Sequence, residues 1–293
     1  MVLKEGFYTA LGTPIDASGS FAPAGFEKQI RDQIACGASG LLVMGSMGVE
    51  PCMRDGDYRA VAQSAAETNK GRLPVFVGAM DNSVSRVMDR IDALKGLKLD
   101  GVVVTAPFYF VLGRAELMAF FRAIADRSPF PLYLYDLPTV VKHKITVDMA
   151  FELAEHRNIR GIKTADLSMC RFLKNDPRTA GKFQVLYSGL DTLDAAYAYG
   201  LHMGLDGMFA MMPRTIADFY KCASSGDLAA ATRHLDLILK TRDFLFTVGI
   251  WRGFSYCLNL LGCEGRFTPD YDPPITDADR SRVKEFLESN RLM

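Results

Sequence analysis

A lysine that could act as a nucleophile stands in the stretch Arg160-Gly161-Ile162-Lys163-Thr164-Ala165-Asp166, which reads as a short buried strand and its exit. Burying an ammonium among apolar residues is costly, so such a lysine is paired, reaches water or stays neutral. An apolar pocket can lower the usual lysine pKa of about 10.4, and an unprotonated amine condenses with a ketone to form an imine. Alternatively, Lys163 has a structural role: its apolar carbon chain is buried and its ammonium group pairs with a carboxylate such as that of Asp166.

The elements around this lysine alternate strand and helix patterns along most of the 293 residues. Short runs rich in β-branched and aromatic residues lack period-two alternation, as parallel strands buried on both faces do. About eight strands predict an α/β fold, a (β/α)8 TIM barrel, and no G-x-G-x-x-G follows the first strand to favour an open doubly wound sheet. The expected strands are 7–11, 40–44, 74–78, 101–105, 131–135, 159–163, 183–187 and 207–211.

Helical patterns continue beyond the last expected strand, at 228–248, 250–261 and 277–287. This is more helix than a closing barrel needs, so the sequence predicts a C-terminal three-helix subdomain packed on the side of the barrel. We expect the barrel to span residues 1–225 and the subdomain residues 226–293, with no flexible linker between them.

The charge and composition exclude several classes of function. Lys+Arg and Asp+Glu both number 34, so no net field attracts nucleic acid or anionic lipid. No apolar stretch is long enough to span a bilayer, and the first residues lack a signal-peptide pattern. The six cysteines form no C-x-x-C pair and the four histidines show no ligand-like spacing, so we expect no metal and no cofactor. These features predict a cytoplasmic protein.

In a TIM barrel the active site lies at the C-terminal ends of the strands, so the residues that end each run should share one mouth. The residues at these strand ends, together with the motifs around them, resemble those of the pyruvate-dependent aldolases of the dihydrodipicolinate synthase and N-acetylneuraminate lyase superfamily. The matching motifs are Gly12-Thr13-Pro14, Gly45-Ser46-Met47-Gly48 for the family's G-[ST]-[ST]-G-E turn, Pro107-Phe108-Tyr109, Tyr135-Asp136-Leu137-Pro138 for Y-N-x-P, Gly161-Ile162-Lys163 for G-[IV]-K, and Ser188-Gly189-x-Asp191.

The resemblance implies a homotetramer, built as a dimer of dimers, whose lysine forms an imine with a 2-oxo acid such as pyruvate or a 2-keto-3-deoxy acid. Lys163 would attack the ketone, and its imine would withdraw electrons from the bond that breaks or forms. Tyr135 would move protons beside the imine. Ser46 would add a hydroxyl to the site, and Tyr109 would reach the hydroxyl relay of a neighbouring subunit. These four residues are the expected catalytic set. As alternatives, Tyr135 is an ordinary core tyrosine and Tyr109 is an exposed aromatic residue in a loop.

The expected substrate contacts lie around these four residues. The Gly45-Ser46-Met47-Gly48 turn would offer backbone N–H groups to a carboxylate, because glycines let the chain approach an anion closely. As an alternative, the turn merely connects a strand to a helix. The further expected contacts are Thr13, Gly189, Asp191 and Phe209.

Some positions depart from the family pattern and bear on the substrate. Val140 stands where the resemblance places an arginine for the second substrate's carboxylate, which argues against lysine biosynthesis. Thr192 and Met211 stand where sialic acid lyases bind sugar hydroxyls, which argues against a long polyol. Val49 displaces the family glutamate by one place, to Glu50. Phe209 and two methionines, Met211 and Met212, either line the mouth as adaptable apolar surface or pack in the core.

The sequence therefore predicts a carbon–carbon lyase of the class I aldolase type that acts on a 2-oxo acid, with pyruvate as donor or product. A 2-keto-3-deoxy acid dehydratase that uses the same imine is an alternative within the superfamily. A catalytically silent ligand-binding barrel is a second alternative, prompted by the altered glycine turn and by Asp136 in place of the usual asparagine.

Overall fold

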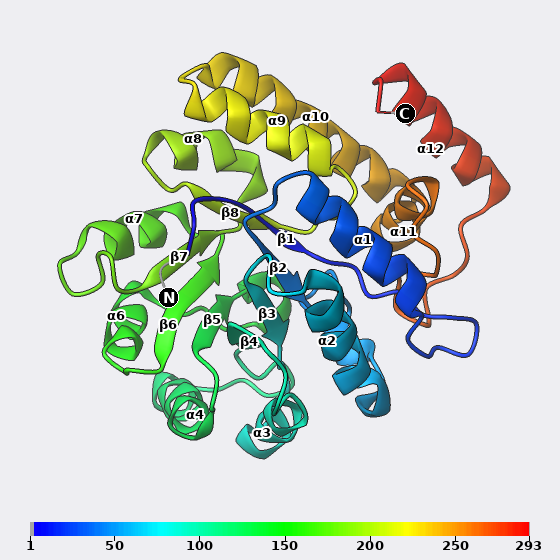
Figure 1. Cartoon of the computed structure of the whole chain (residues 1–293). Coiled ribbons are helices and arrows are strands. Elements are labelled where there is room, and N and C mark those ends of the chain that lie inside the picture. Colours follow the sequence, from blue (N-terminus) through cyan, green and yellow to red (C-terminus); the bar gives the residue numbers. More distant parts are fainter. Residues whose placement is uncertain (1–2, 293) are drawn as a thin grey trace.

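Eight parallel strands close into a barrel in the computed structural model, which describes residues 3–292 (Figure 1). The strands are β1 (Gly6–Ala10), β2 (Gly40–Val43), β3 (Val75–Gly78), β4 (Gly101–Thr105), β5 (Leu132–Asp136), β6 (Ile159–Thr164), β7 (Gln184–Tyr187) and β8 (Met203–Asp206). Each strand pairs in parallel with the next along the chain, and β1 pairs with β8. The expected (β/α)8 TIM barrel is confirmed.

Helices surround the barrel and shield the outer face of every strand (Figure 1). Three short 3-10 turns, η1 (Glu50–Cys52), η2 (Leu190–Thr192) and η3 (Met208–Ala210), follow β2, β7 and β8. The helices are α1 (Pro23–Ala35), α2 (Asp55–Asn69), α3 (Val84–Ala93), α4 (Arg114–Arg127), α5 (Pro138–Val141), α6 (Val147–Ala154), α7 (Leu167–Asn175), α8 (Leu193–Ala198), α9 (Pro213–Ser224), α10 (Leu228–Val248), α11 (Ile250–Leu260) and α12 (Asp277–Ser289).

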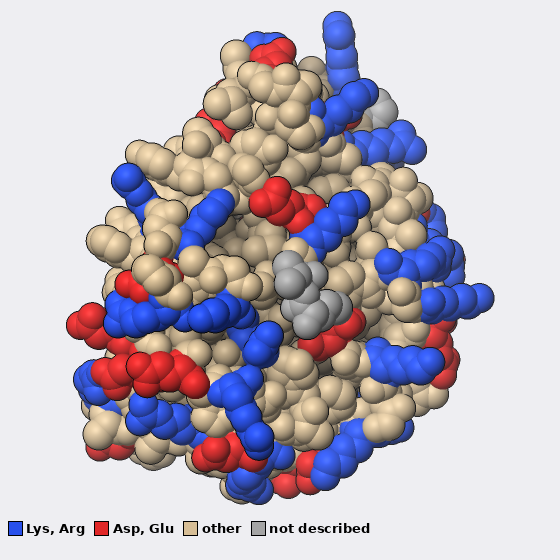
Figure 2. Space-filling view, turned by 60° about the vertical axis from the view of Figure 1, so that its left-hand side comes forward, with Lys and Arg blue, Asp and Glu red and all other residues tan. Residues whose placement is uncertain are grey.

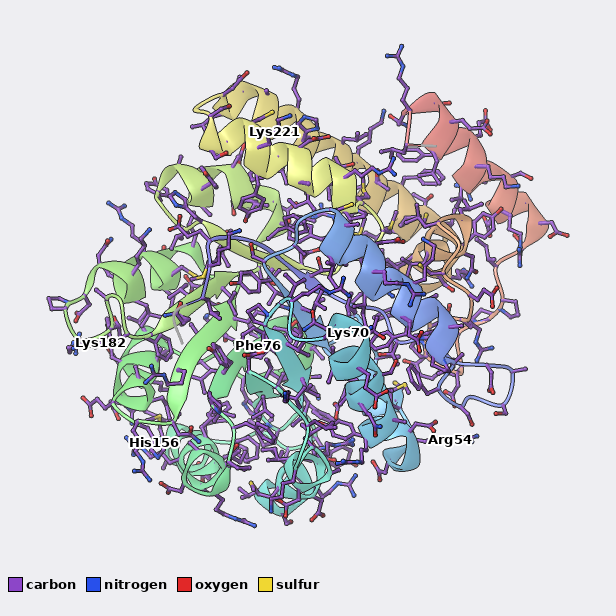
Figure 3. All side chains as sticks on the ribbon, viewed as in Figure 1. Arg54, Lys70, Phe76, His156, Lys182 and Lys221 are labelled. Atoms are coloured by element: carbon purple, nitrogen blue, oxygen red, sulfur yellow. The ribbon has the colours of Figure 1, made fainter. Side chains whose placement is uncertain are left out.

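Alternation along each strand separates two apolar layers. Residues such as Val102 and Val104 point outward and pack with the helices, whereas Val103 belongs to the cluster inside the barrel. Phe76 lies in this inner cluster, near the centre of the molecule in Figure 3. Because both faces of each strand are buried, the strand sequences are apolar runs without polar alternation.

Two glycines make room for a tyrosine inside the barrel. Tyr133 of β5 lies between Gly101 of β4 and Gly161 of β6, and a Cβ atom at either glycine would come 2.8 Å from the tyrosine ring. The ring of Phe76 meets Tyr133 edge to face, with the ring centroids 4.8 Å apart. The glycine that precedes Lys163 by two places is therefore required by packing beneath the mouth.

The eighth strand lies four residues earlier than the sequence predicted. β8 spans Met203–Asp206, whereas most of the expected strand 207–211 is the turn η3. The backbone N–H of Met208 donates to the Asp206 carboxylate at 2.8 Å, which fixes the turn directly after the strand. The apolar run that suggested a strand packs instead between the barrel and its helices, with Phe209 only 1% exposed.

The three helices expected at the C-terminus are present as α10, α11 and α12. α10 packs along α8 and α9, and α12 lies farthest from the barrel axis (Figure 1). Gly249 separates α10 from α11 with a φ of 92°, a conformation that favours glycine. Leu235, Ile238 and Phe254 join the same apolar layer as the barrel helices, and the division into two domains near residue 225 stays a prediction.

Charged side chains of both signs are interspersed on the face shown in Figure 2, as the balanced composition suggests. Within residues 3–292, no helix has the length and apolar character needed to cross a membrane.

Candidate active site

Lys163 and Tyr135 lie side by side at the mouth of the barrel. They are paired residues of the neighbouring strands β5 and β6, and both side chains point inward. The Lys163 Nζ atom donates to the Tyr135 hydroxyl at 2.8 Å and lies 4.0 Å from the centre of its ring. Their exposed fractions are only 5% and 4%. Asp166, the alternative partner for this lysine, is 3.1 Å from Lys144 instead.

Ser46 joins this pair from the loop after β2. Its hydroxyl donates to the Tyr135 hydroxyl at 3.4 Å, so the phenol stands between an amine and a second hydroxyl. The loop is tightly wound: Gly48 leaves no room for a side chain, because a Cβ atom there would lie 2.8 Å from the Met44 backbone. Positive φ angles of 51° at Met44 and 47° at Val49 bracket the turn. Such strain in non-glycine residues is typical of functional loops.

Val49 lies between the glycine turn and Glu50 in a left-handed backbone conformation, with a φ of 47°. Glu50 follows it and is completely buried behind the turn. A β-branched residue in this conformation is a genuine backbone outlier. The turn therefore keeps a strained valine directly beside a buried carboxyl.

Three further expected contacts lie near the ends of the strands. Met47 crosses toward the end of β8, where a Cβ atom on Gly207 would come 2.7 Å from its Cγ atom. Gly189 follows β7, and its small size leaves space for the Tyr187 hydroxyl. Thr13 follows β1, is fully buried, and has no hydrogen-bond partner for its hydroxyl among the described residues.

Three other expected residues are not brought to the Lys163–Tyr135 pair within this chain. Tyr109 is 73% exposed in the loop after β4. Asp191 points outward and binds Arg242 of α10 through two hydrogen bonds of 2.8 and 2.9 Å. Phe209 lies in the layer between barrel and helices, edge to face with Phe7 at 6.2 Å, so it does not line the mouth as expected.

An ion-pair bridge beside the pair was not expected from the sequence. Asp136, next to Tyr135, is buried and binds three groups: the Thr164 hydroxyl at 2.7 Å, the Ile145 N–H at 3.0 Å and the Lys144 ammonium. Lys144 also reaches Asp166 at 3.1 Å. Burial opposes the charge, but these two carboxylates prevail and raise the pKa of Lys144. The bridge ties the end of β5 to the end of β6, which holds Tyr135 and Lys163 in register.

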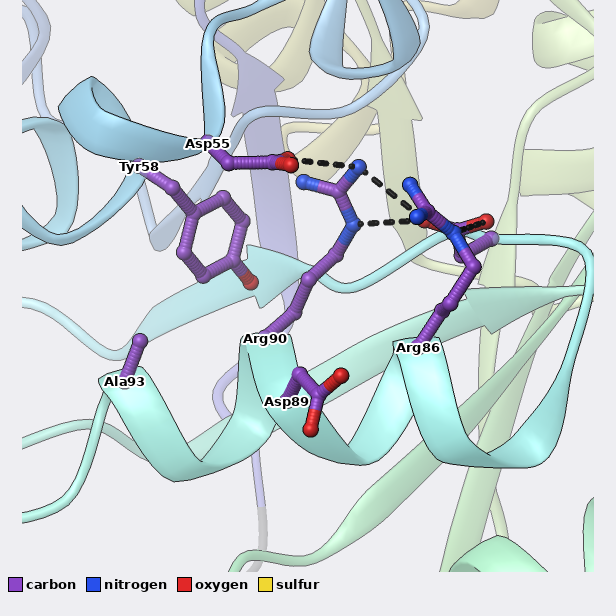
Figure 4. A pocket seen from close by; sticks show the side chains of 7 residues that line it. Asp55, Tyr58, Arg86, Asp89, Arg90 and Ala93 are labelled. Carbon is purple, nitrogen blue, oxygen red and sulfur yellow. Dashed lines mark hydrogen bonds and ion pairs between the residues drawn. The ribbon is translucent and has the colours of Figure 1, made fainter.

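A second charge cluster surrounds Arg90, and Figure 4 shows part of it. Arg90 of α3 lies 3.1 Å from Glu50, 3.1 Å from Asp81 and 3.4 Å from Asp55. Burial raises the pKa of Glu50 to about 8, although Arg90 opposes this rise. Burial also acts on Asp81, but the hydrogen bond from Arg86 and the charge of Arg90 hold its pKa below the ordinary value. The cluster contributes to a cavity of about 140 Å³.

The chemistry available at the mouth is that of an amine, a phenol and hydroxyls. Among residues 3–292, no group of three histidine, cysteine or acidic side chains is arranged to hold a metal ion. An amine and a phenol in contact can form an imine and transfer protons during its formation.

Known proteins match this chain over nearly its whole length. The model of the dihydrodipicolinate synthetase family matches residues 4–289. The 4-hydroxy-tetrahydrodipicolinate synthase of Phenylobacterium zucineum is 30% identical over 282 residues, 95% of each chain. The protein of the same name from Gluconacetobacter diazotrophicus is 28% identical over 290 residues, 99% of this chain and 98% of the relative.

Two solved structures share the fold. YagE, a prophage protein of the dihydrodipicolinic acid synthase family from E. coli K12, in complex with pyruvate, has a TM-score of 0.89 at 22% identity over 99% of both chains. CdNal from Clostridium difficile, in complex with mannosamine, has a TM-score of 0.89 at 18% identity over 97% of this chain and 98% of CdNal. The chain therefore belongs to the dihydrodipicolinate synthetase family, and the expected enzyme class, a lyase of the class I aldolase type acting on a 2-oxo acid, is confirmed by that membership.

Proposed function

We propose that Lys163 is the nucleophile that forms the imine with the 2-oxo acid and that pyruvate is the donor or product. The observation that carries this assignment is the 2.8 Å contact between the Lys163 amine and the Tyr135 hydroxyl, both buried at the mouth. The amine nitrogen bonds to the ketone carbon, and the ketone oxygen leaves as water after gaining two protons. The phenol is placed to transfer protons to and from these atoms.

The proposed carbon–carbon step follows from the imine. The protonated imine accepts the electron pair of the bond that breaks, and an enamine forms in place of a bare carbanion. In the reverse direction the enamine attacks an aldehyde, and the new alkoxide takes a proton. The Ser46 hydroxyl also donates to the Tyr135 hydroxyl. Together with the N–H groups of the turn at 45–48, it is proposed to hold the substrate carboxylate.

The second substrate is proposed to differ from that of the named relatives. Val140 on α5 is 59% exposed and uncharged at the position where the family pattern places an arginine. The Asp191 carboxylate is occupied by Arg242. Assaying candidate 3-deoxy-2-oxo acids separately for pyruvate release and for loss of water distinguishes the aldolase from the dehydratase alternative.

Borohydride reduction in the presence of pyruvate tests the nucleophile. We expect intact mass measurement to show one covalent adduct per chain on the wild type and none on Lys163→Ala. Lys182→Ala is the matched control, because this exposed lysine lies at the edge of the molecule (Figure 3) and should leave the adduct unchanged. An adduct that survives in Lys163→Ala refutes the assignment, and no adduct on the wild type favours a silent ligand-binding barrel.

The assembly is proposed to be a tetramer of two dimers in the cytoplasm. Two separate sets of large apolar side chains are exposed: Tyr109, Phe110 and Val111 after β4, with exposed fractions of 73%, 69% and 82%, and Phe172 of α7 with Tyr199, at 59% and 56%. A tetramer with three twofold axes can be held by two different self-complementary interfaces. The first set would bring Tyr109 to the active site of a second copy.

Light scattering tests this assembly. We expect Phe110→Asp and Phe172→Asp each to give dimers and the double variant to give monomers, because each charge would be buried in one interface only. A wild type that is monomeric at all concentrations contradicts the proposal.

A further inference from the structure

Thr105, at the end of β4, has a buried hydroxyl without a hydrogen-bond partner among the described residues. The residue is only 2% exposed. Strand alternation directs its side chain into the barrel, because Val103 lies in the inner cluster while Val102 and Val104 pack with the helices. The hydroxyl therefore faces the interior at the level of the mouth.

Thr105 continues the row of the two proposed catalytic residues. It is paired with Tyr135 in the register of β4 and β5, and Tyr135 is paired with Lys163 in the register of β5 and β6. Neighbouring strands lie about 4.8 Å apart, so the row places a threonine, a tyrosine and a lysine next to one another on the inner face. Thr105 is thus the immediate neighbour of Tyr135 on the side away from Lys163.

The unpartnered hydroxyl needs an explanation, because most buried polar groups in native proteins are paired. Valine has nearly the same shape as threonine and would avoid the desolvation of the hydroxyl. Val103, which points into the barrel two residues earlier in the same strand, is apolar, so the inner face of β4 accommodates such a side chain. A partner that arrives with the substrate accounts for the polar residue.

We propose that Thr105 is a substrate-binding residue whose hydroxyl hydrogen-bonds an oxygen atom of the 2-oxo acid held at Lys163. This inference rests on the proposed function. A hydroxyl can donate or accept, so it suits either a carboxylate or a hydroxyl oxygen. Its place beside Tyr135 puts a third hydroxyl, after those of Ser46 and Tyr135, around the reacting atoms.

The variant Thr105→Val separates this role from a structural one. We expect the pyruvate concentration that half-saturates borohydride trapping to rise about 10-fold, the effect of losing roughly one hydrogen bond in a buried site. The thermal midpoint without ligand should stay the same or rise, because an unpaired hydroxyl is removed. Thr105→Ser keeps the hydroxyl and should restore most of the affinity.

Thr9→Val is the matched control. Thr9 is also buried in a strand, but its hydroxyl points outward and donates to Gln33 at 2.6 Å. This variant should lower the thermal midpoint and leave trapping unchanged, the opposite pattern to Thr105→Val.

Three outcomes decide the matter. Weaker pyruvate trapping by Thr105→Val with an unchanged or raised thermal midpoint supports the proposal. Normal trapping by Thr105→Val alongside a normal wild-type adduct overturns the role of Thr105 and leaves Lys163 as the nucleophile. An absent adduct on the wild type overturns both the proposed function and the role of Thr105.

Discussion

Replacing Glu50 by glutamine should remove a pH-dependent loss of stability. Glu50 is completely buried, and burial raises its pKa from 4.5 to about 8. Between these two values the folded protein keeps a proton on this carboxyl that the unfolded chain releases. The folded state binds more protons, so its contribution to the free energy of unfolding falls as the pH rises through this range. Glutamine has a similar shape and cannot ionise.

The size of the effect follows from the same two values. Their difference corresponds to about 5 kcal/mol, at about 1.4 kcal/mol for each tenfold change in proton affinity. This is an upper bound, because Arg90 lies 3.1 Å from Glu50 and can turn toward the ionised carboxylate. We therefore expect the variant to gain about 2 to 5 kcal/mol on the wild type between pH 5 and pH 8.5.

Urea unfolding at fixed protein concentration measures this gain. Unfolding curves for the wild type, Glu50→Gln and the exposed control Glu285→Gln should be recorded at half-unit intervals from pH 5 to pH 8.5. Each variant differs from the wild type at one side chain only, so the difference between two curves isolates one carboxyl. If the difference between wild type and Glu50→Gln is the same at pH 5 and at pH 8.5, Glu50 does not change its protonation in this range, which refutes the expected gain.

Three further predictions concern other parts of the barrel. Tyr135→Phe should lower kcat by about 10²- to 10⁴-fold with little change in melting temperature, because it removes one proton-transfer group. Steady-state kinetics and calorimetry measure these two quantities, and an unchanged kcat would exclude the phenol from the reaction. Lys144→Met should lower the free energy of unfolding by about 1 to 3 kcal/mol, because the buried Asp136 carboxyl group loses an ion-pair partner that is itself partly exposed. Adding Asp136→Asn should recover part of this loss, and strictly additive effects in urea unfolding would contradict the bridge. Gly78→Ala should lower the free energy of unfolding by several kcal/mol or prevent folding, because the new Cβ atom would collide with the backbone carbonyl after β2. Gly56→Ala has open space around it and should raise the free energy of unfolding by about 0.5 kcal/mol. Equal stability of the two variants in thermal unfolding would contradict this difference in packing.

The sequence predicted most of the barrel because parallel strands buried on both faces leave recognisable apolar runs. β4 spans Gly101–Thr105 as predicted, and six other strands overlap their expected ranges. β8 was misplaced because Gly204 and Asp206 interrupt its apolar character, while the run from Phe209 to Met212 is apolar for another reason: it packs beneath the helices. An apolar run indicates that a segment is buried, but burial alone does not distinguish a strand from a tight turn.

The predictability of the site differed between strand ends and loops. Lys163 and Tyr135 end neighbouring strands, so the fold alone brings them together. Asp191 lies beyond a strand end, where its direction is set by Arg242, 51 residues away in the sequence. Thr105 gave no signal, because its unpartnered hydroxyl is a property of the packed interior. The bridge through Lys144 also depends on contacts that form only after folding.

The pairing of β1 with β8 has a consequence for biosynthesis. The partner of Gly6 is Met203 and that of Thr9 is Asp206, so about 200 residues separate the two edges that meet. A ribosome that adds residues one at a time must release nearly all of the eight strands before the first and last can hydrogen-bond. Until then the nascent sheet has two open edges that can pair with other chains. Protection of the emerging polypeptide by chaperones should matter most while residues 10–203 are outside the ribosome and the sheet is still open.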